Sequence, residues 1–427
     1  MFLDLDYPEG YLSFFKDRRV SNSYLSRACV ERGLDKFILD KAFTGLKWRP
    51  PFVDEATAKT EQSQSGKRKM STKILADVME ALIGAAFVDG GMAETIACMS
   101  TLLPDHEWIS VERSGQILFD NVASDMALPP AMASSLEPLI GYTFNKKALL
   151  YEAMTHGSYN GTSLRSLETL EFLGDAILDY IIVTRLFASS PLLPHSKIHR
   201  LKTALVNGDF QAFLVMETYA VQEATEITKD LEIKRTEFSQ PLWAFMMHSS
   251  TVIGVEQNIM KQRHIEMRGD IISALERGAN YPWALLSRLR ARKFLSDLFE
   301  SLLGAVWVDS RNMQACEALL ERFGLLRHME RFVRDEVEVT HPKEELGLLA
   351  GNKTVRYVID TVLDDGGDKL FTCQVFVGGE IKAEVMDGVD KEEVKTKAAE
   401  LAVRVMKEEG RESKEAAEGG EAMDLDP

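Results

Sequence analysis

The sequence has few of the side chains that bind zinc or form disulfides. Among its 427 residues are four cysteines and eight histidines. The cysteines are far apart and lack the paired spacing of zinc ligands, so we interpret them as core thiols in a reducing compartment. They are Cys29, Cys98, Cys316 and Cys373. This pattern disfavours both a structural zinc centre and a disulfide-stabilised secreted fold.

Long apolar runs and targeting signals are also missing. No stretch reaches the roughly 18 apolar residues of a membrane span, and the N-terminus lacks a basic segment followed by an apolar one. Hydrophobic residues make up 45% of the chain, which is enough for two or three domains with real cores. We therefore expect a soluble, intracellular protein, cytoplasmic or nuclear, with no membrane partner.

The sequence contains no G-x-x-x-x-G-K loop, which excludes a P-loop nucleotide site. Its net charge of −16 is unfavourable for a nucleic-acid partner. Part of that charge lies in residues 408–427, which are rich in glycine, alanine and glutamate. We expect this segment to be a disordered acidic tail.

Acidic residues are present in an unusual place. Residues 168–178 read ETLEFLGDAIL, and on a helix Glu168, Glu171 and Asp175 share one face. The residues between them are typical of a core, and like charges this close repel each other. The pattern indicates a bound cation, and hard oxygen ligands favour Mg²⁺ or Mn²⁺ over zinc.

A second acidic pair lies in residues 293–308, KFLSDLFESLLGAVWV, at Asp297 and Glu300. If the two helices pack, Glu171, Asp175, Asp297 and Glu300 converge, as two-metal hydrolysis of phosphodiesters requires. Acidic pairs at this spacing are often surface residues, but two pairs in apolar surroundings argue against that alternative.

The glycines of these helices, Gly174 and Gly304, each predict a close backbone approach, because glycine destabilises a helix interior by about 1 kcal/mol.

These segments resemble the ribonuclease III family. Residues 167–178 are similar to its signature, residues 293–309 to its second catalytic helix, and residues 140–159 to its opening helix and loop. The resemblance implies cleavage of double-stranded RNA with the four carboxylates as catalytic metal ligands. Glu168 is expected to orient a ligand or a metal-bound water. Lys293 either steadies the phosphate or the carboxylates, or forms a salt bridge within its helix.

The chain repeats itself. Residues 73–89 match residues 293–309 at an offset of 220, and a second segment matches with Val20 opposite Val206, at an offset of 186. Two such domains, with extra length in the second, resemble the C-terminal half of the Dicer family. The first copy retains only Asp77 and Glu80 as a vestigial site, because the chain begins after the place of its acidic helix. We therefore expect either a fragment or a natural short form.

Residues 341–407 alternate as three strands between two helices, an α-β-β-β-α order that resembles a double-stranded RNA-binding domain. Lys391 and Lys395 are its expected RNA contacts, although Glu392 stands where the family has a lysine. A cap on the second nuclease domain is the alternative role. The basic run 288–293 also predicts RNA-backbone contacts, with a solvated face as its alternative. Its candidate residues are Arg288, Arg290 and Arg292.

We therefore expect a mainly α chain of tandem ribonuclease III domains followed by a small α+β domain. The expected parts are a truncated first nuclease domain (1–110), a linker (111–135), a complete second domain (136–335), the RNA-binding-like domain (341–407) and the tail (408–427). The resemblance implies a Dicer-like endoribonuclease of RNA silencing, acting on double-stranded RNA with two metal ions. The alternative is a non-catalytic or nicking-only RNA-binding fragment. The nuclease domains are expected to pair within the chain, and a homodimer through the second would restore two full sites.

Overall fold

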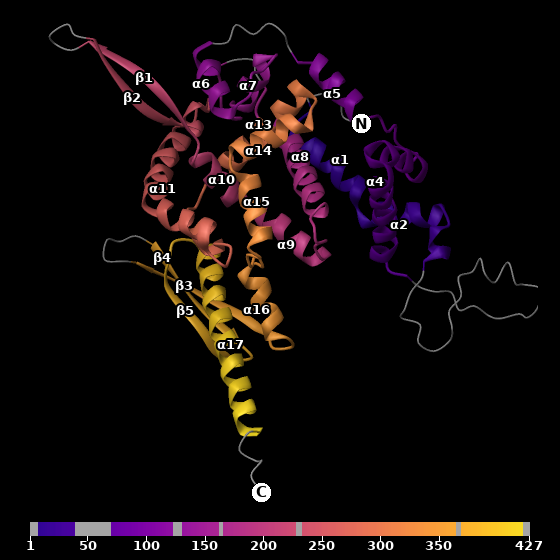
Figure 1. Ribbon diagram of the computed structural model, residues 1–427, viewed down its shortest axis with the longest axis vertical. Coiled ribbons are helices and arrows are strands. Elements are labelled where there is room, and N and C mark those ends of the chain that lie inside the picture. The colour runs from indigo at the N-terminus through magenta and orange to yellow at the C-terminus, as the bar shows by residue number, and fades with distance from the viewer. Residues whose placement is uncertain are drawn as a thin grey trace, which may run out of the picture. The chain divides into compact units, whose positions relative to one another are not determined.

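The computed structural model describes residues 7–38, 70–122, 130–161, 165–227, 233–363 and 369–421. The chain divides into two compact units, Met1–Asp125 and Met126–Pro427, which are described separately. Most of the described residues are helical, and the one three-stranded sheet among them lies near the C-terminus (Figure 1). The predicted mainly α fold with a small α+β domain is confirmed.

The first unit contains four α-helices and one 3₁₀ turn among its described residues. They are α1 (Glu9–Val20), α2 (Asn22–Glu31), η1 (Leu34–Phe37), α4 (Thr72–Leu102) and α5 (Val111–Asp120). Helices α2 and α4 form the core through Leu25, Cys29, Ala76 and Met79. Because these apolar residues recur at helical spacing, each helix has one buried stripe.

The second unit begins with the nuclease-like helices. They are α6 (Pro130–Ile140), α7 (Lys147–Ala153), α8 (Glu168–Phe187), α9 (His195–Leu205), α10 (Gly208–Met216), α11 (Thr251–Arg277), α12 (Trp283–Arg288), α13 (Lys293–Ser310), α14 (Met313–Arg322) and α15 (Leu325–Arg334). Between α10 and α11 lie an antiparallel hairpin, β1 (Tyr219–Ile227) with β2 (Ile233–Pro241), and the turn η2 (Leu242–Phe245).

Helix α13 is the centre of this unit, since it is apolar around most of its circumference and buried along most of its length. Its last acidic residue, Asp309, is fully buried but well bonded. The Asp309 carboxylate accepts hydrogen bonds from the Tyr142 hydroxyl at 2.8 Å and from the backbone N–H groups of Asn145 and Lys146 at 2.8 and 2.9 Å. These bonds fasten the loop before α7 to the end of α13.

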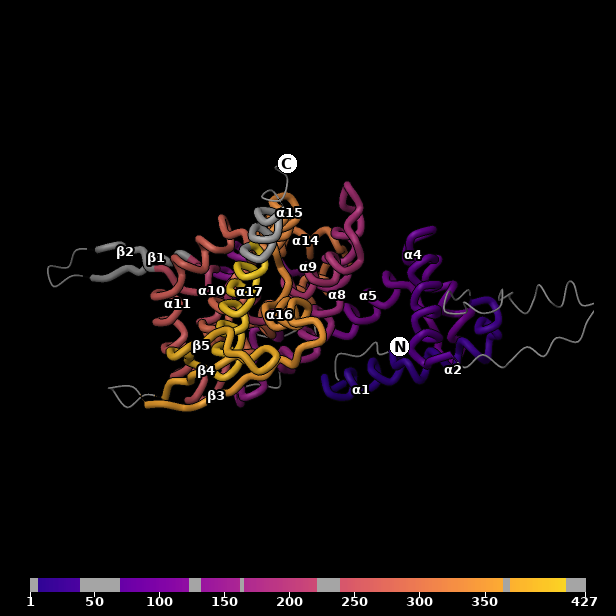
Figure 2. The backbone as a smooth tube through the Cα atoms, turned by 90° about the horizontal axis from the view of Figure 1, so that it is seen from below, coloured from indigo at the N-terminus to yellow at the C-terminus, as the bar shows by residue number. Residues whose placement is uncertain are grey.

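The C-terminal domain has the predicted α-β-β-β-α order. Its elements are α16 (Pro342–Ala350), β3 (Val355–Leu363), β4 (Lys369–Val377), β5 (Glu380–Gly388) and α17 (Lys391–Glu421). The strands form an antiparallel sheet in the order β3-β4-β5. Helix α17 lies along one face of this sheet in both views (Figures 1 and 2), and Val394, Ala398 and Ala402 join Val375 and Val385 in the core.

Two segments are more ordered than expected. The predicted linker contains α5, whose N-cap Ser110 accepts a hydrogen bond from the Arg113 N–H at 3.1 Å. The predicted disordered tail is helical through Glu421, because α17 continues without a break and its residues favour helix. Lys382 of β5 holds this extension at Glu409, with an Nζ–Oε1 distance of 2.9 Å. Residues 422–427 lie outside the described part of the chain.

No helix in the described ranges is both long enough and apolar enough to cross a membrane.

Candidate metal centre

Helices α8 and α13 carry the predicted acidic residues and pack with their backbones in contact. A Cβ atom on Gly174 would lie 1.8 Å from the main-chain oxygen of Glu300, and one on Gly304 would lie 2.2 Å from that of Leu170. Only glycine fits at such distances, so the close approach predicted at both positions is confirmed. The contact brings the acidic faces of the two helices together.

Three of the four predicted ligands converge. Oxygen atoms of Glu171, Asp297 and Glu300 all lie within 4.8 Å of one another, and all three residues are partly buried. In the described parts of the chain, this is the one group of three or more potential ligands at such distances. Carboxylate oxygens without histidine or cysteine are the ligands that Mg²⁺ and Mn²⁺ favour.

Asp175 does not belong to this compact set. It lies one turn after Glu171 on α8 and is partly buried. Its charge contributes to the raised pKa of Glu300, so it is electrostatically close to the set. The four predicted residues therefore form a group of three with Asp175 beside it.

Lys293 lies between the two acidic helices. Its Nζ atom is 2.9 Å from Glu171 Oε1 and 2.6 Å from Asp297 Oδ1. Burial lowers the pKa of Lys293, but hydrogen bonds to both carboxylates outweigh it and raise the pKa. Lys293 therefore forms the salt bridge within its helix and also pairs with Glu171 of the other acidic helix, while its predicted contact with a phosphate stays a prediction.

The carboxylates carry more negative charge than Lys293 neutralises. Burial raises the pKa of Glu300 to about 8, and the nearby Asp175, Glu171 and Asp297 add to the effect. Burial also raises the pKa of Asp297, against the opposing effect of Lys293. Like charges held in a partly buried site repel each other, so a divalent cation would be favoured there.

Glu168 is exposed at the start of α8. A Cβ atom on Gly157 would lie 3.0 Å from Glu168 Oε1, so this side chain lies against the loop before α8. The charge of Glu168 raises the pKa of Asp297. Its predicted role in orienting a ligand or a metal-bound water stays a prediction.

The first unit places its two acidic residues differently. Asp77 and Glu80 of α4 are exposed, and Lys73 Nζ lies 3.0 Å from Asp77 Oδ1. Gly84 corresponds to Gly304 in the repeat, but a Cβ atom on Gly84 would meet nothing within 4 Å. The described part of the first unit therefore offers these two carboxylates no facing acidic helix.

Two predicted RNA-binding arginines have protein partners. Arg288 Nη1 donates to the main-chain oxygen of Asp387 at 3.0 Å and to Glu393 Oε1 at 3.1 Å, and Glu393 is fully buried. Arg292 Nε donates to Glu256 Oε2 at 2.9 Å. Arg288 therefore joins the nuclease helices to the C-terminal domain, and phosphate contact by either arginine would compete with these bonds.

The remaining predicted RNA contacts differ from one another. Arg290 and Lys391 are exposed. Lys395 Nζ lies 2.7 Å from Glu392, and Lys343 Nζ lies 2.6 Å from the same carboxylate. These two lysines lower the pKa of Glu392 to about 2, so it stays ionised. Glu392, which stands where the family has a lysine, is thus ion-paired with these two neighbouring lysine side chains.

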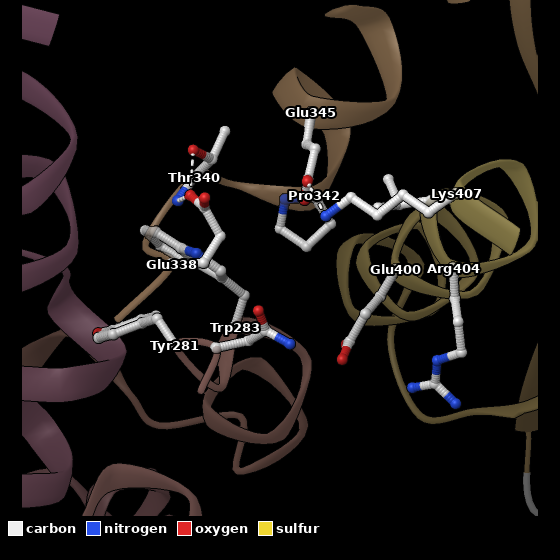
Figure 3. Close-up of a pocket in the computed structure, with 11 residues that line it drawn as sticks. Tyr281, Trp283, Glu338, Thr340, Pro342, Glu345, Glu400, Arg404 and Lys407 are labelled. Atoms are coloured by element: carbon white, nitrogen blue, oxygen red, sulfur yellow. Dashed lines mark hydrogen bonds and ion pairs between the residues drawn. The ribbon is translucent and has the colours of Figure 1, made fainter. Parts of the chain in front are cut away.

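The seam between the nuclease helices and the C-terminal domain is polar. Arg200 donates to Glu344 Oε1 at 2.9 and 3.0 Å, and Trp283 Nε1 donates to the main-chain oxygen of Val339 at 3.2 Å. A cavity of about 130 Å³ lies at this seam, with Tyr281 and Trp283 on one side and Glu400 and other α17 residues on the other (Figure 3). The C-terminal domain is therefore docked on the second nuclease domain.

Sequence reasoning missed Gln211 of α10, a fully buried polar residue whose side chain lowers the pKa of Glu300 against the larger effect of burial. The signal was present as a single amide in the apolar run FQAFLVM, residues 210–216.

Comparison with known families agrees with this architecture. The model of the ribonuclease III domain matches residues 1–91 and 168–311. The model of the double-stranded RNA-binding domain of Dicer-like protein 2 matches residues 335–426.

Curated relatives extend the match over nearly the whole chain. Dicer-like protein 2 of Pyricularia oryzae is 43% identical over 96% of this chain, and that of Cryphonectria parasitica is 42% identical over 94%. The matched region is 29% of the length of each relative, within their C-terminal part.

Solved structures also show similarity. The nuclease domain of ribonuclease III from Campylobacter jejuni is 23% identical, and the match covers 46% of this chain and 95% of that chain with a TM-score of 0.26. Dicer from Pichia stipitis is 16% identical, covering 60% and 92% with a TM-score of 0.24. The family models and the curated relatives together show that the chain belongs to the ribonuclease III family, in its Dicer-like group.

Proposed function

We propose that the second nuclease domain is a metal-dependent endoribonuclease for double-stranded RNA. The observation that carries this proposal is the convergence of Glu171, Asp297 and Glu300 within 4.8 Å across two helices. In this proposal they hold Mg²⁺ or Mn²⁺, with Asp175 as the fourth ligand. Two bound ions would lower the barrier to in-line attack on a phosphodiester and stabilise the departing 3′ oxygen.

The chain's own residues supply positioning. Lys293 links Glu171 to Asp297 and so keeps ligands from α8 and α13 together while no ion neutralises them. In the presence of an ion, its ammonium group is free to turn toward an RNA phosphate, since 75% of the side chain is exposed. Glu168, at the rim of the group, would orient a ligand or a water molecule.

The proposed substrate is A-form RNA, which is recognised through its shape, phosphates and 2′-hydroxyl groups rather than its sequence. The match of residues 335–426 to a double-stranded RNA-binding domain supports this choice. By analogy with the Dicer-like relatives, the products would enter RNA silencing.

A matched pair of variants tests the proposal. Asp297→Asn should abolish Mg²⁺-dependent cleavage of an end-labelled duplex, while Asp77→Asn, at the corresponding position of the first copy, should leave it unchanged. Chelation of the divalent ions with EDTA should stop cleavage by the unsubstituted protein. Cleavage that survives Asp297→Asn, or that needs no divalent ion, would contradict the proposed centre.

The exposed Asp77 and Glu80 favour a narrower alternative, a nicking enzyme. Two carboxylates without further ligands are a poor site for two cations, so a monomer would cut one strand only. Denaturing gels would show the nick while native gels show an intact duplex. Double-strand cuts that appear only at higher protein concentration would indicate a homodimer through the second domain.

A further inference from the structure

The cavity at the seam has an aromatic wall whose polar atoms are bonded elsewhere. Tyr281 and Trp283 are only 4% and 7% exposed, and their ring centroids lie 4.6 Å apart. The Tyr281 hydroxyl donates to the main-chain oxygen of Ala204 at 2.8 Å, and Trp283 Nε1 donates to that of Val339 at 3.2 Å. Both side chains therefore offer ring carbon atoms, rather than hydrogen-bonding groups, to the cavity that they line.

The opposite wall carries a carboxylate. Glu400 of α17 is partly buried, and Figure 3 shows it extending from the helix toward Trp283. Among the described residues, Glu400 makes no hydrogen bond or ion pair. Arg404, one turn further along α17, is exposed and points away from Trp283, while Lys407 is paired with Glu345. Burial raises the pKa of Glu400, and the positive charges on α17 offset this effect only in part.

The size and chemistry of the cavity together select its guest. Its volume is about 130 Å³, slightly less than the apolar cavity of about 150 Å³ that holds benzene. Glu400 would repel an anion, and a neutral apolar group would leave its carboxylate unpaired. A metal ion needs several converging oxygens, and among the described residues the one group of three is Glu171, Asp297 and Glu300. An organic cation suits both walls, because it pairs with a carboxylate and is attracted to the faces of aromatic rings.

We propose that this cavity binds the ammonium end of a small aliphatic amine, with Glu400 as the counter-ion and the Trp283 and Tyr281 rings as the aromatic wall. The two walls come from different parts of the second unit. Trp283 begins α12 of the nuclease helices, whereas Glu400 lies on α17 of the C-terminal domain. A bound amine therefore contacts both parts and strengthens the docking of the C-terminal domain. The site is separate from the metal centre and needs neither RNA nor a divalent ion.

The test titrates n-butylammonium chloride into the full chain in EDTA, without RNA and at constant ionic strength. We expect a saturable change in tryptophan fluorescence and a rise in melting temperature. Glu400→Gln should weaken binding by about tenfold or more, because it removes the charged partner. Arg404→Gln should strengthen binding, because it removes a like charge beside the amine. The matched control is Glu408→Gln, which makes the same charge change at an exposed position of α17 outside the cavity and should bind like the parent.

Each outcome decides for or against the site. Trp283→Phe should remove most of the fluorescence change; a signal that persists places the amine elsewhere and overturns the proposal. Equal responses of the parent and Glu400→Gln would mean that amines bind the acidic surface generally, and would also overturn it. So would a parent protein without a saturable response. If Glu400→Gln does not fold, Arg404→Gln decides, and an affinity that does not rise refutes the site. Cleavage is not measured, so failure here leaves the proposed function standing.

Discussion

The substitution Glu300→Gln should make the metal-free protein more stable at alkaline pH and should abolish metal binding. Glu300 is a partly buried carboxyl near three other acidic residues, and burial raises its pKa from 4.5 to about 8. Glutamine has nearly the same shape without the charge, so Glu300→Gln separates electrostatic effects from packing.

The sign and size of this stability change follow from the linkage between protonation and folding. The folded protein holds the Glu300 proton more tightly than the unfolded chain does. The associated stability is therefore fully present below pH 4.5 and is lost as the pH rises through about 8. Because one pKa unit corresponds to about 1.4 kcal/mol, ionisation destabilises the metal-free domain by on the order of 5 kcal/mol.

Thermal melting at pH 5 and pH 9, with EDTA and with Mg²⁺, measures this effect. In EDTA we expect equal melting temperatures at pH 5 and a higher one for Glu300→Gln at pH 9. Mg²⁺ should reverse the order at pH 9, because the ion stabilises the parent only. A variant that melts below the parent at both pH values in EDTA would refute the electrostatic reasoning.

Three further changes have defined outcomes. Lys293→Met should lower the melting temperature in EDTA, and Mg²⁺ should restore it by replacing the missing positive charge; equal loss in both conditions would contradict this. Gly304→Ala should destabilise the protein by several kcal/mol through its clash with the facing backbone, whereas Gly84→Ala should change the free energy of unfolding by less than about 1 kcal/mol; urea titration compares them. Arg288→Ala should increase proteolysis between the nuclease helices and the C-terminal domain, and adding Glu393→Gln should reduce it again, because the buried side chain at position 393 then carries no uncompensated charge.

The acidic helices could be predicted because carboxylates at helical spacing in an apolar run repel each other unless a cation neutralises them. Their exact neighbours could not be predicted. Periodicity shows which face of a helix is buried but not which residue lies opposite. The sequence therefore did not predict that Asp175 lies outside the compact group.

The partners of the basic residues were not predictable either. A run of arginines has the same sequence whether phosphate or carboxylate neutralises it. For Arg288 the partner is Glu393, 105 residues further along the chain. The helix beyond residue 407 was missed for a related reason. A composition typical of a disordered tail is also rich in good helix formers, and the preceding helix spares it the cost of nucleation.

The glycine contacts between α8 and α13 have a further consequence. Where side chains separate two helices, a change in one side chain is absorbed by shifts of its neighbours. At Gly174 and Gly304 nothing lies between the backbones to absorb it. The distance between the acidic residues on the two helices is therefore set by main-chain van der Waals radii, a length that substitutions elsewhere in the core leave unchanged. The spacing within the proposed metal centre is thus fixed by the backbone, and any side chain at either glycine would change that spacing.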